Sequence, residues 1–251
     1  MATDSEPLTR RERLRRQTVE EIKQHAFELV DEGGLNHVSI ASVGKAMGMT
    51  PPALYRYFPS REALLDALLI AAYADLGSTI AAAGREGLEG PEGLEGREEA
   101  GRDAPGRVAR IGHAYRRWAL DHPRRYVMLF SDRSPGADDP PEGVIAFNQG
   151  MLALLDALAE IASPSPSDGA PLDEALLRWA RDIGAPAGIS MRALRVAVLG
   201  WSRIHGLVSL EISGAFDGMG MDAGHLLAAE IETVVAAAGA RPSPSGARDR
   251  A

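Results

Sequence analysis

The chain of 251 residues has 45% hydrophobic side chains, a formal net charge of −8 and no cysteine. This length fits one or two domains, and the apolar content excludes a wholly disordered chain. The lack of cysteine excludes disulfides, thiolate zinc sites and cysteine nucleophiles, and the acidic charge argues against a histone-like coat on DNA. No segment reaches about 18 uncharged apolar residues and the start of the chain is polar, so we expect a soluble, cytoplasmic protein without an export signal.

The chain begins with a predicted basic N-terminal arm, residues 1–17. Residues 1–70 carry nine basic and ten acidic side chains, a net of −1. A local charge of +4 arises within this stretch from Arg10, Arg11, Arg13, Arg15 and Arg16 against Glu12. Such a cluster is typical of a solvated helix start and equally of an arm that binds nucleic acid, so both interpretations remain open.

Helical periodicity dominates the next part of the chain, and no alternation of apolar and polar residues is long enough for a sheet. Gly33-Gly34 and Gly48 are expected helix stops, Ser39 and Ser60 are expected N-caps, and Thr50-Pro51 reads as an N-cap with the first residue of a helix. The expected helices run from Val19 to Val30, from Ser39 to Met47, from Thr50 to Tyr57 and from Ser60 to about Ala83.

A low-complexity segment, residues 84–106, follows the long helix. Glycine recurs every three residues from Gly84 to Gly96, mostly with a glutamate two places on. These triplets hold a single proline and are too few for a collagen helix, so we predict a flexible acidic linker.

Helical stripes resume after the linker and define a second domain, residues 107–238, followed by a disordered tail, residues 239–251. The stripe from Leu194 to Val208 is accompanied by Val196, Leu199, Leu207 and Leu210 on other faces. A helix that is apolar on more than one face is either central in a bundle or shared with another subunit. The stripes are Val108–Ala119, Tyr126–Phe130, Val144–Leu158, Leu172–Ile183, Leu194–Val208 and Leu227–Val234.

The predicted fold is therefore all-α, with an N-terminal helix-turn-helix domain, residues 18–78, joined by a long helix to a larger helical bundle. The helix-turn-helix spans about residues 39–58. Leu54 and Phe58 are expected in the core. Tyr55 and Tyr57 cannot both point into one small core, so we expect at least one of them to face outward. The start of the second helix is small and suits close approach to base edges, while a threonine and free backbone N–H groups there suit a phosphate. The outward residues of this helix are Thr50, Pro51, Pro52, Ala53, Tyr55, Arg56 and Tyr57.

The segment Gly48–Leu65, within residues 18–78, resembles the DNA-binding domain of TetR-type transcriptional regulators. The resemblance implies that Tyr55 and Tyr57 contact the DNA backbone or thymine methyl groups, and that Thr50, Pro51 and Pro52 lie at the edge of the major groove. It also implies that Ser39 and Arg61 hold phosphates, while Arg10 and Arg11 are DNA-binding candidates from the basic arm. Three positions depart from the family pattern. Gly44 replaces alanine at an expected cost of about 1 kcal/mol to its helix, Arg61 replaces lysine, and Ala63 leaves the Ser60 capping box incomplete.

The second half, about residues 107–235, resembles a C-terminal subclass with a Trp…His-Gly signature, carried by Gly200–Glu211 and His122–Phe130. The resemblance implies binding of a small molecule and of a dimer partner. For each ligand candidate plain core packing is an alternative, as it is for the Trp201 and His205 pair. The ligand candidates are Tyr115, Trp118, Met128, Phe147, Met151 and Trp179. The dimer candidates are Val198, Trp201, His205, Gly206, Leu227 and Ile231.

These features predict a homodimeric, ligand-responsive regulator, most simply a repressor, on a palindromic operator of double-stranded DNA. No catalytic, metal-binding or cofactor-binding motif is evident, so we expect no enzyme activity and no cofactor. The alternative is a helical small-molecule-binding protein or enzyme with a vestigial helix-turn-helix. An architectural DNA binder without effector control is a third reading, which the acidic net charge disfavours.

Overall fold

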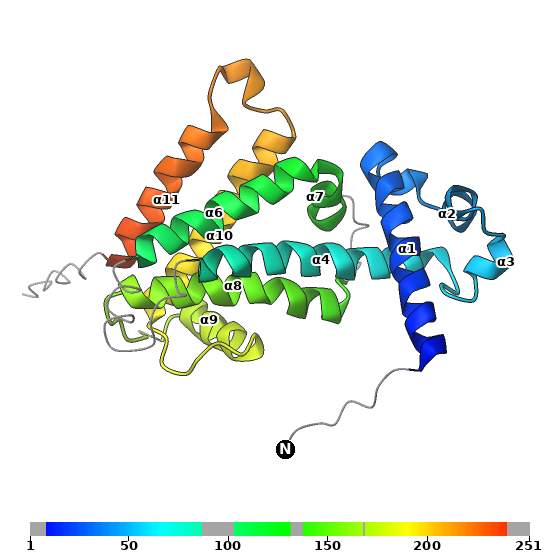
Figure 1. The fold of residues 1–251 in the computed structure, drawn as a ribbon. Helices are drawn as coiled ribbons and strands as arrows, with labels where there is room; N and C mark the ends of the chain where they lie inside the picture. Colours follow the sequence, from blue (N-terminus) through cyan, green and yellow to red (C-terminus); the bar gives the residue numbers. More distant parts are fainter. Residues whose placement is uncertain (1–8, 87–102, 132–137, 168, 240–251) are drawn as a thin grey trace, which may run out of the picture. The chain divides into compact units, whose positions relative to one another are not determined.

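A computed structural model describes residues 9–86, 103–131, 138–167 and 169–239. Within these ranges the chain forms ten α-helices and two short 3-10 helices, without a strand (Figure 1). The predicted all-α fold is therefore confirmed. Most of the predicted linker, the first eight residues and residues 240–251 lie outside the described residues. The two ends of the linker prediction that are described belong to helices, because α4 continues to Arg85 and α6 begins at Ala104.

The helices gather into two compact units. The first unit holds the residues up to Tyr73 together with residues 122–143, and the second holds residues 74–121 and those from Val144 onward. The long helix α4 (Arg61–Arg85) contributes its first half to the first unit and its second half to the second.

The first unit is built on α1 and has a small apolar core. Helix α1 begins with a complete capping box, in which Thr9 and Glu12 bond each other's backbone N–H groups. It ends at Gly33, and its C-cap is Gly34, whose φ is 75°. Buried side chains of α1, α2, α3 and α4 fill the core, among them Ile22, Val43, Leu54 and Leu68. Its helices are α1 (Arg10–Gly33), η1 (Leu35–His37), α2 (Ile40–Met47), α3 (Pro51–Leu54), the start of α4, and α7 (Pro123–Phe130).

Helix α7 joins this first unit although it follows α6 in the sequence. The guanidinium of Arg125 donates to both carboxylate oxygens of Asp31, with a shortest distance of 2.6 Å, and lies 4.4 Å from the ring centre of Phe27. The hydroxyl of Tyr73 lies 3.2 Å from the carbonyl oxygen of Leu129. The compact units therefore divide the chain differently from the predicted boundaries at 18–78 and 107–238, because α7 packs on α1.

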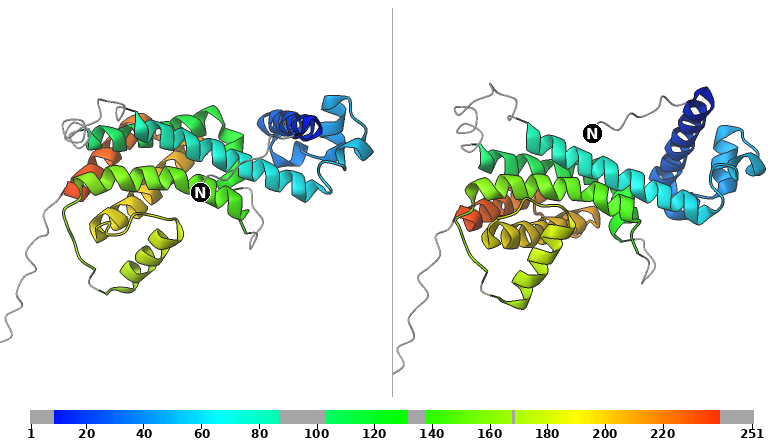
Figure 2. Two further views of the ribbon diagram at one scale, coloured as in Figure 1. Left: turned by 60° about the horizontal axis from the view of Figure 1, so that its bottom comes forward. Right: turned by 90° about the horizontal axis from the view of Figure 1, so that it is seen from below.

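The second unit is a bundle around α6 and α10. Its helices are the second half of α4, α6 (Ala104–Asp121), α8 (Pro141–Ile161), α9 (Pro171–Asp182), α10 (Met191–Ile212) and α11 (Ala223–Gly239). The views in Figure 2 show α8 beside the second half of α4, where Gly150 meets the side chain of Ile80.

A buried arginine ties three helices of the second unit together. Arg107 of α6 is 2% exposed. Its guanidinium donates to the carbonyl oxygen of Gly84 at 3.0 Å, to Glu160 at 2.7 Å and to Asp156 at 2.5 Å. Because a buried charge is costly unless it is paired, this network fixes the register of α4, α6 and α8.

Helices α4 and α8 are, by length and composition alone, long and apolar enough to cross a membrane. Core helices of soluble proteins pass the same test. Both helices contribute fully buried leucines to the two units, including Leu64, Leu68, Leu155 and Leu158.

Candidate nucleic-acid interface

The helix-turn-helix of the first unit is formed by α2, a glycine turn and α3. Ser39 caps α2 as predicted, and its partner in the capping box is the hydroxyl of Ser42. Gly48 ends the helix with a φ of 65°, a left-handed conformation that favours glycine. The N–H of Met49 then bonds the carbonyl oxygen of Gly44 at 2.8 Å. The local sequence therefore sets both the end of α2 and the tightness of the turn.

Gly44 has a packing role that the sequence comparison missed. A methyl group at this position would lie 2.9 Å from the carbonyl oxygen of Met49 and 3.1 Å from the Cδ1 atom of Leu54. The glycine therefore lets the turn and α3 approach α2 more closely than alanine would, in addition to lowering the helix propensity of α2.

Helix α3 is shorter than predicted. It ends at Leu54, and the residues up to Tyr57 form a turn closed by the bond from the Tyr57 N–H to the Leu54 carbonyl oxygen at 2.8 Å. Leu54 and Phe58 are buried, as expected for core residues. Tyr55 is 51% exposed and Arg56 is exposed, while Tyr57 is half-buried. The turn thus points Tyr55 and Arg56 outward without requiring a further helical residue.

The start of α3 offers fewer backbone donors than the sequence argument assumed. Pro51 and Pro52 have no N–H group, and the N–H of Ala53 donates to the carbonyl oxygen of Thr50 at 2.9 Å. Thr50 occupies the N-cap position, but its hydroxyl makes no capping bond. Anion contacts at this end of α3 must therefore come from side chains, above all from the exposed hydroxyl of Thr50.

Arginines at the start of α1 lie beside α3. Arg15 donates to the carbonyl oxygen of Arg56 at 3.3 Å, and its guanidinium lies 5.3 Å from the ring centre of Tyr57. These contacts complete a surface groove, called here the arginine groove, lined by Arg10, Arg11, Leu14, Arg15, Thr18, Met49, Ala53, Arg56 and Tyr57. The described part of the predicted arm, from Arg10 onward, is therefore helical, and it places Arg10 and Arg11 next to α3.

Arg15 is a member of this groove that the sequence reasoning did not single out. It lies four residues after Arg11 and so shares its helical face. This four-residue spacing from Arg11 is the feature of the sequence that could have indicated a role for Arg15.

Two predicted phosphate contacts already serve the fold. Arg61 donates to the carbonyl oxygens of Val38 at 2.8 Å and Leu35 at 2.9 Å, and so ties the start of α4 to η1. The hydroxyl of Ser39 is half-buried in the cap of α2. A phosphate role for either residue stays a prediction, and an Arg61→Ala variant would weaken the fold as well as any DNA contact.

The predicted ligand residues do not all come together. Tyr115, Phe147 and Met151 line one cavity of the second unit, and Trp179 lines a neighbouring groove with Phe147 and Met151. Met128 does not join them, because it is buried in the core of the first unit, and its ligand role stays a prediction. Trp118 lines neither space. It is buried and its Nε1 donates to Asp75 at 2.7 Å, so the structure gives it a packing role.

The predicted dimer residues also separate into different places. Leu227 and Ile231 are 0% and 5% exposed, so they pack in the core of one protomer, and their dimer role stays a prediction. Trp201 and Val198 line the groove just described, and His205 bonds the hydroxyl of Tyr115 at 2.7 Å while stacking on Trp201. Gly206 faces open space, because a methyl group added there would meet nothing within 4 Å.

Comparisons with known proteins match both halves of the chain. A sequence profile of bacterial regulatory proteins of the tetR family matches residues 22–68, the segment that holds α2 and α3. A second profile, the C-terminal domain of tetracycline repressor-like proteins, matches residues 108–234 and thus more than half of the chain. The chain belongs to the TetR family. It is accordingly a helix-turn-helix transcriptional regulator that binds DNA, and its named relatives are regulators rather than enzymes.

Individual known proteins are similar to this chain over nearly its whole length. The HTH-type transcriptional regulator Rv1816 of Mycobacterium tuberculosis is 27% identical over 235 residues, which cover 88% of this chain and 94% of the relative. The crystal structure of the regulatory protein candidate SCO4313 has a TM-score of 0.69 and 36% identity, and covers 90% of this chain and 98% of its own. A protein of unknown function from Rhodococcus sp. RHA1 shares the fold with a TM-score of 0.61 at 19% identity, over 95% of this chain and all of its own.

Proposed function

We propose that this TetR-family protein is a cytoplasmic, homodimeric repressor that binds a palindromic operator and leaves it when a small molecule binds in the second unit. The observation that carries the proposal is the exposed start of α3 beside the arginine groove. Small residues there can approach base edges, and flanking cations can reach phosphates on either side.

The side chains around α3 divide the work of binding DNA. Pro51, Pro52 and Ala53 add little bulk, so α3 can enter the major groove deeply. Thr50 and Tyr55 present hydroxyls to phosphate oxygens, and the tyrosine ring can cover a thymine methyl group. Arg10, Arg11 and Arg15 neutralise phosphates and supply affinity without sequence information.

An exposed stripe of α10 supports the dimer. Leu199, Arg203, Gly206 and Leu210 follow one another at spacings of four, three and four residues, so they share a helical face. The two leucines are 48% and 49% exposed, and a methyl group added to Gly206 would meet nothing within 4 Å. Large apolar side chains exposed together on one helix favour burial against the same helix of a second copy, related to the first by a two-fold axis.

Repression with release by a ligand requires two states of the dimer. The ligand shifts their populations only if it has a higher affinity for the state that cannot bind the operator than for the state that can. A two-fold dimer reads two half-sites whose centres are about 34–36 Å apart, or a larger separation set by further helical turns of DNA.

The experiment that tests the proposal is capture of genomic DNA. Purified protein is mixed with fragments of its own genome at physiological salt, and the bound fragments are sequenced. We expect a few enriched fragments that share an inverted repeat, and loss of this enrichment in a Tyr55→Ala variant that keeps its thermal unfolding midpoint. Recovery of fragments without a shared site, or no recovery, would contradict the proposal.

A further inference from the structure

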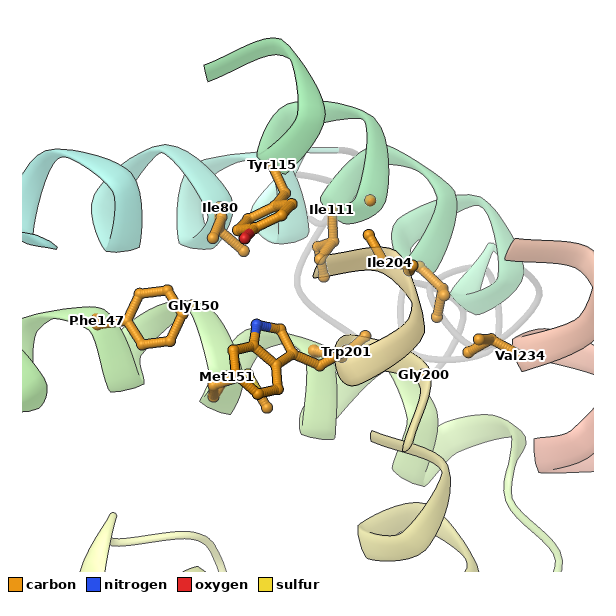
Figure 3. A pocket seen from close by; sticks show the side chains of 13 residues that line it. Ile80, Ile111, Tyr115, Phe147, Gly150, Met151, Gly200, Trp201, Ile204 and Val234 are labelled. Atoms are coloured by element: carbon orange, nitrogen blue, oxygen red, sulfur yellow. The ribbon is translucent and has the colours of Figure 1, made fainter. Parts of the chain in front are cut away.

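The second unit contains two adjoining spaces separated by side chains. An internal cavity of about 30 Å³ is lined by Ile80, Ile111, Tyr115, Phe147, Met151 and Trp201, among others (Figure 3). A surface groove of about 320 Å³ is lined by residues of α8, α9 and α10, including Trp179 and Asn148. Phe147, Met151 and Trp201 line both spaces. They therefore form the partition, and the methionine is a flexible part of it.

The lining is uncharged. Among the described residues that line the cavity or the groove there is no acidic or basic side chain. His205 stacks on the partition residue Trp201 with ring centres 5.3 Å apart, and burial lowers the pKa of this histidine below its ordinary value. The imidazole is therefore neutral near pH 7. An ionised ligand would enter without a partner for its charge, at a large cost in desolvation.

One polar atom in the lining is unsatisfied. The indole Nε1 of Trp201 is buried and has no hydrogen-bond partner among the described residues. Figure 3 shows this nitrogen turned into the space toward Phe147 and Tyr115. The tyrosine hydroxyl is already engaged with Nδ1 of His205 at 2.7 Å. The rest of the cavity lining is apolar, so an acceptor carried on an apolar molecule matches both the N–H and the surrounding side chains.

We propose that the cavity and the groove form one binding site for an uncharged, mainly apolar molecule whose hydrogen-bond acceptor, such as a ketone or ester carbonyl oxygen, accepts the N–H of Trp201. The groove alone falls in the size range of small-molecule sites, roughly 300–1,000 Å³. The inference rests on the proposed function, for which it names the chemical class of the effector. Movement of Met151 opens the partition, so that the ligand reaches past Trp201 into the cavity.

Three related probes test the acceptor and the charge separately. Benzophenone carries a carbonyl acceptor, diphenylmethane has the same two rings without it, and 4-benzoylbenzoate adds a carboxylate. Their dissociation constants are measured by calorimetric titration with the full chain, up to the solubility limit of each probe. We expect benzophenone to bind about fivefold more tightly than diphenylmethane, the ratio that one net hydrogen bond provides. We expect 4-benzoylbenzoate to bind at least about tenfold more weakly than benzophenone.

Two variants test whether the carbonyl oxygen of the probe accepts a hydrogen bond from the Trp201 N–H. Trp201→Phe keeps an aromatic ring in the partition but removes the N–H, so benzophenone and diphenylmethane should bind it equally. Trp118→Phe makes the same change at a tryptophan that lines neither space, so it is the matched control and should keep the fivefold preference. Equal binding of the two neutral probes by the wild type, preferred binding of the carboxylate, or no binding of benzophenone would overturn the inference, and this comparison does not need the variants to fold.

The outcome is separable from that of the proposed function. Protein that enriches an operator from genomic DNA but fails these titrations would refute the assigned ligand class and leave the regulator intact. Protein that shows the probe preference but enriches no operator would refute the proposed function and leave the binding site.

Discussion

At the scale of single residues, the arginine groove predicts that arginines of equal charge differ in their effect on DNA binding. Arg15 lines the groove, whereas Arg13 lies two residues earlier and points about 200° away around α1. Arg15→Ala should weaken operator binding and reduce the slope of log affinity against log salt by about two, one phosphate per protomer.

The matched control is Arg13→Ala, which changes the charge equally and should leave the slope nearly unchanged. Both are measured by DNA-binding titrations between about 50 and 200 mM salt. Equal slopes for the two variants would mean that the cluster acts only through its summed charge, against the proposed docking.

Gly44 gives a second prediction at this scale. Gly44→Ala should destabilise the first unit although alanine is the better helix former by about 1 kcal/mol. The reason is the 2.9 Å approach to the Met49 carbonyl oxygen, which is backbone and cannot move aside cheaply. The measurement is the thermal unfolding midpoint. Ala46→Gly, at an exposed position of the same helix, measures the effect of helix propensity alone. A higher unfolding midpoint for Gly44→Ala than for the wild type would show that the turn can accommodate the added methyl group.

His205 predicts a pH dependence of stability. Desolvation lowers its pKa in the folded state below the ordinary value of 6.5, so the folded protein favours the neutral ring. Below about pH 6.5 the unfolded chain binds the proton more readily, and the free energy of unfolding should fall as the pH drops through that range. Denaturant unfolding at several pH values should show a shallower fall for His205→Gln. His113→Gln, exposed on α6, is the control, and identical slopes for wild type and His205→Gln would remove the histidine from this account.

At the scale of elements, Arg107 predicts how strongly the second unit depends on one side chain. Removing one partner of a buried ion pair costs about 3–5 kcal/mol, and the partial exposure of Asp156 and Glu160 places the expected loss for Arg107→Ala toward the lower end. Arg110→Ala, which breaks a more exposed pair with Asp103, should cost less than about 1 kcal/mol. Denaturant midpoints measure both variants, and equal losses would argue against the role given to Arg107.

Element boundaries were predictable where local chemistry sets them. Ser39, Gly48 and Ser60 act on their own neighbours, so the ends of α2 and the start of α4 were confirmed. The length of α3 was overestimated because the apolar pattern at Leu54 and Phe58 is satisfied by a turn as well as by a helix. The sequence does not decide between an arm and a helix at the start of α1, because Thr9 and Glu12 form a cap without an apolar stripe directly behind it.

Side-chain roles that depend on tertiary packing could not be predicted from the sequence. Periodicity marks Leu227, Ile231 and Met128 as facing something apolar, but it cannot tell a core from a subunit interface or from a ligand pocket. The unsatisfied Nε1 of Trp201 has no sequence signal either, because it is defined only by which acceptors the other helices bring near it. Resemblance to the TetR family supplied what periodicity could not, namely the role of α2 and α3.

At the scale of the whole molecule, the central claim is sequence-specific binding by two protomers. A helix-turn-helix, a cationic groove and an exposed apolar stripe on α10 are separate features, and the proposed symmetric complex would use all three. The proposed dimer has a two-fold axis, and this symmetry predicts the same symmetry in the DNA site.

The most direct measurement is a footprint on a captured genomic fragment combined with the mass of the complex. The account predicts two equally protected half-sites in an inverted repeat, centred about 34–36 Å apart or at a larger separation allowed by further helical turns, with two protomers bound together. Protection without symmetry, a single protomer on a single site, or affinity no higher than for bulk DNA would contradict it.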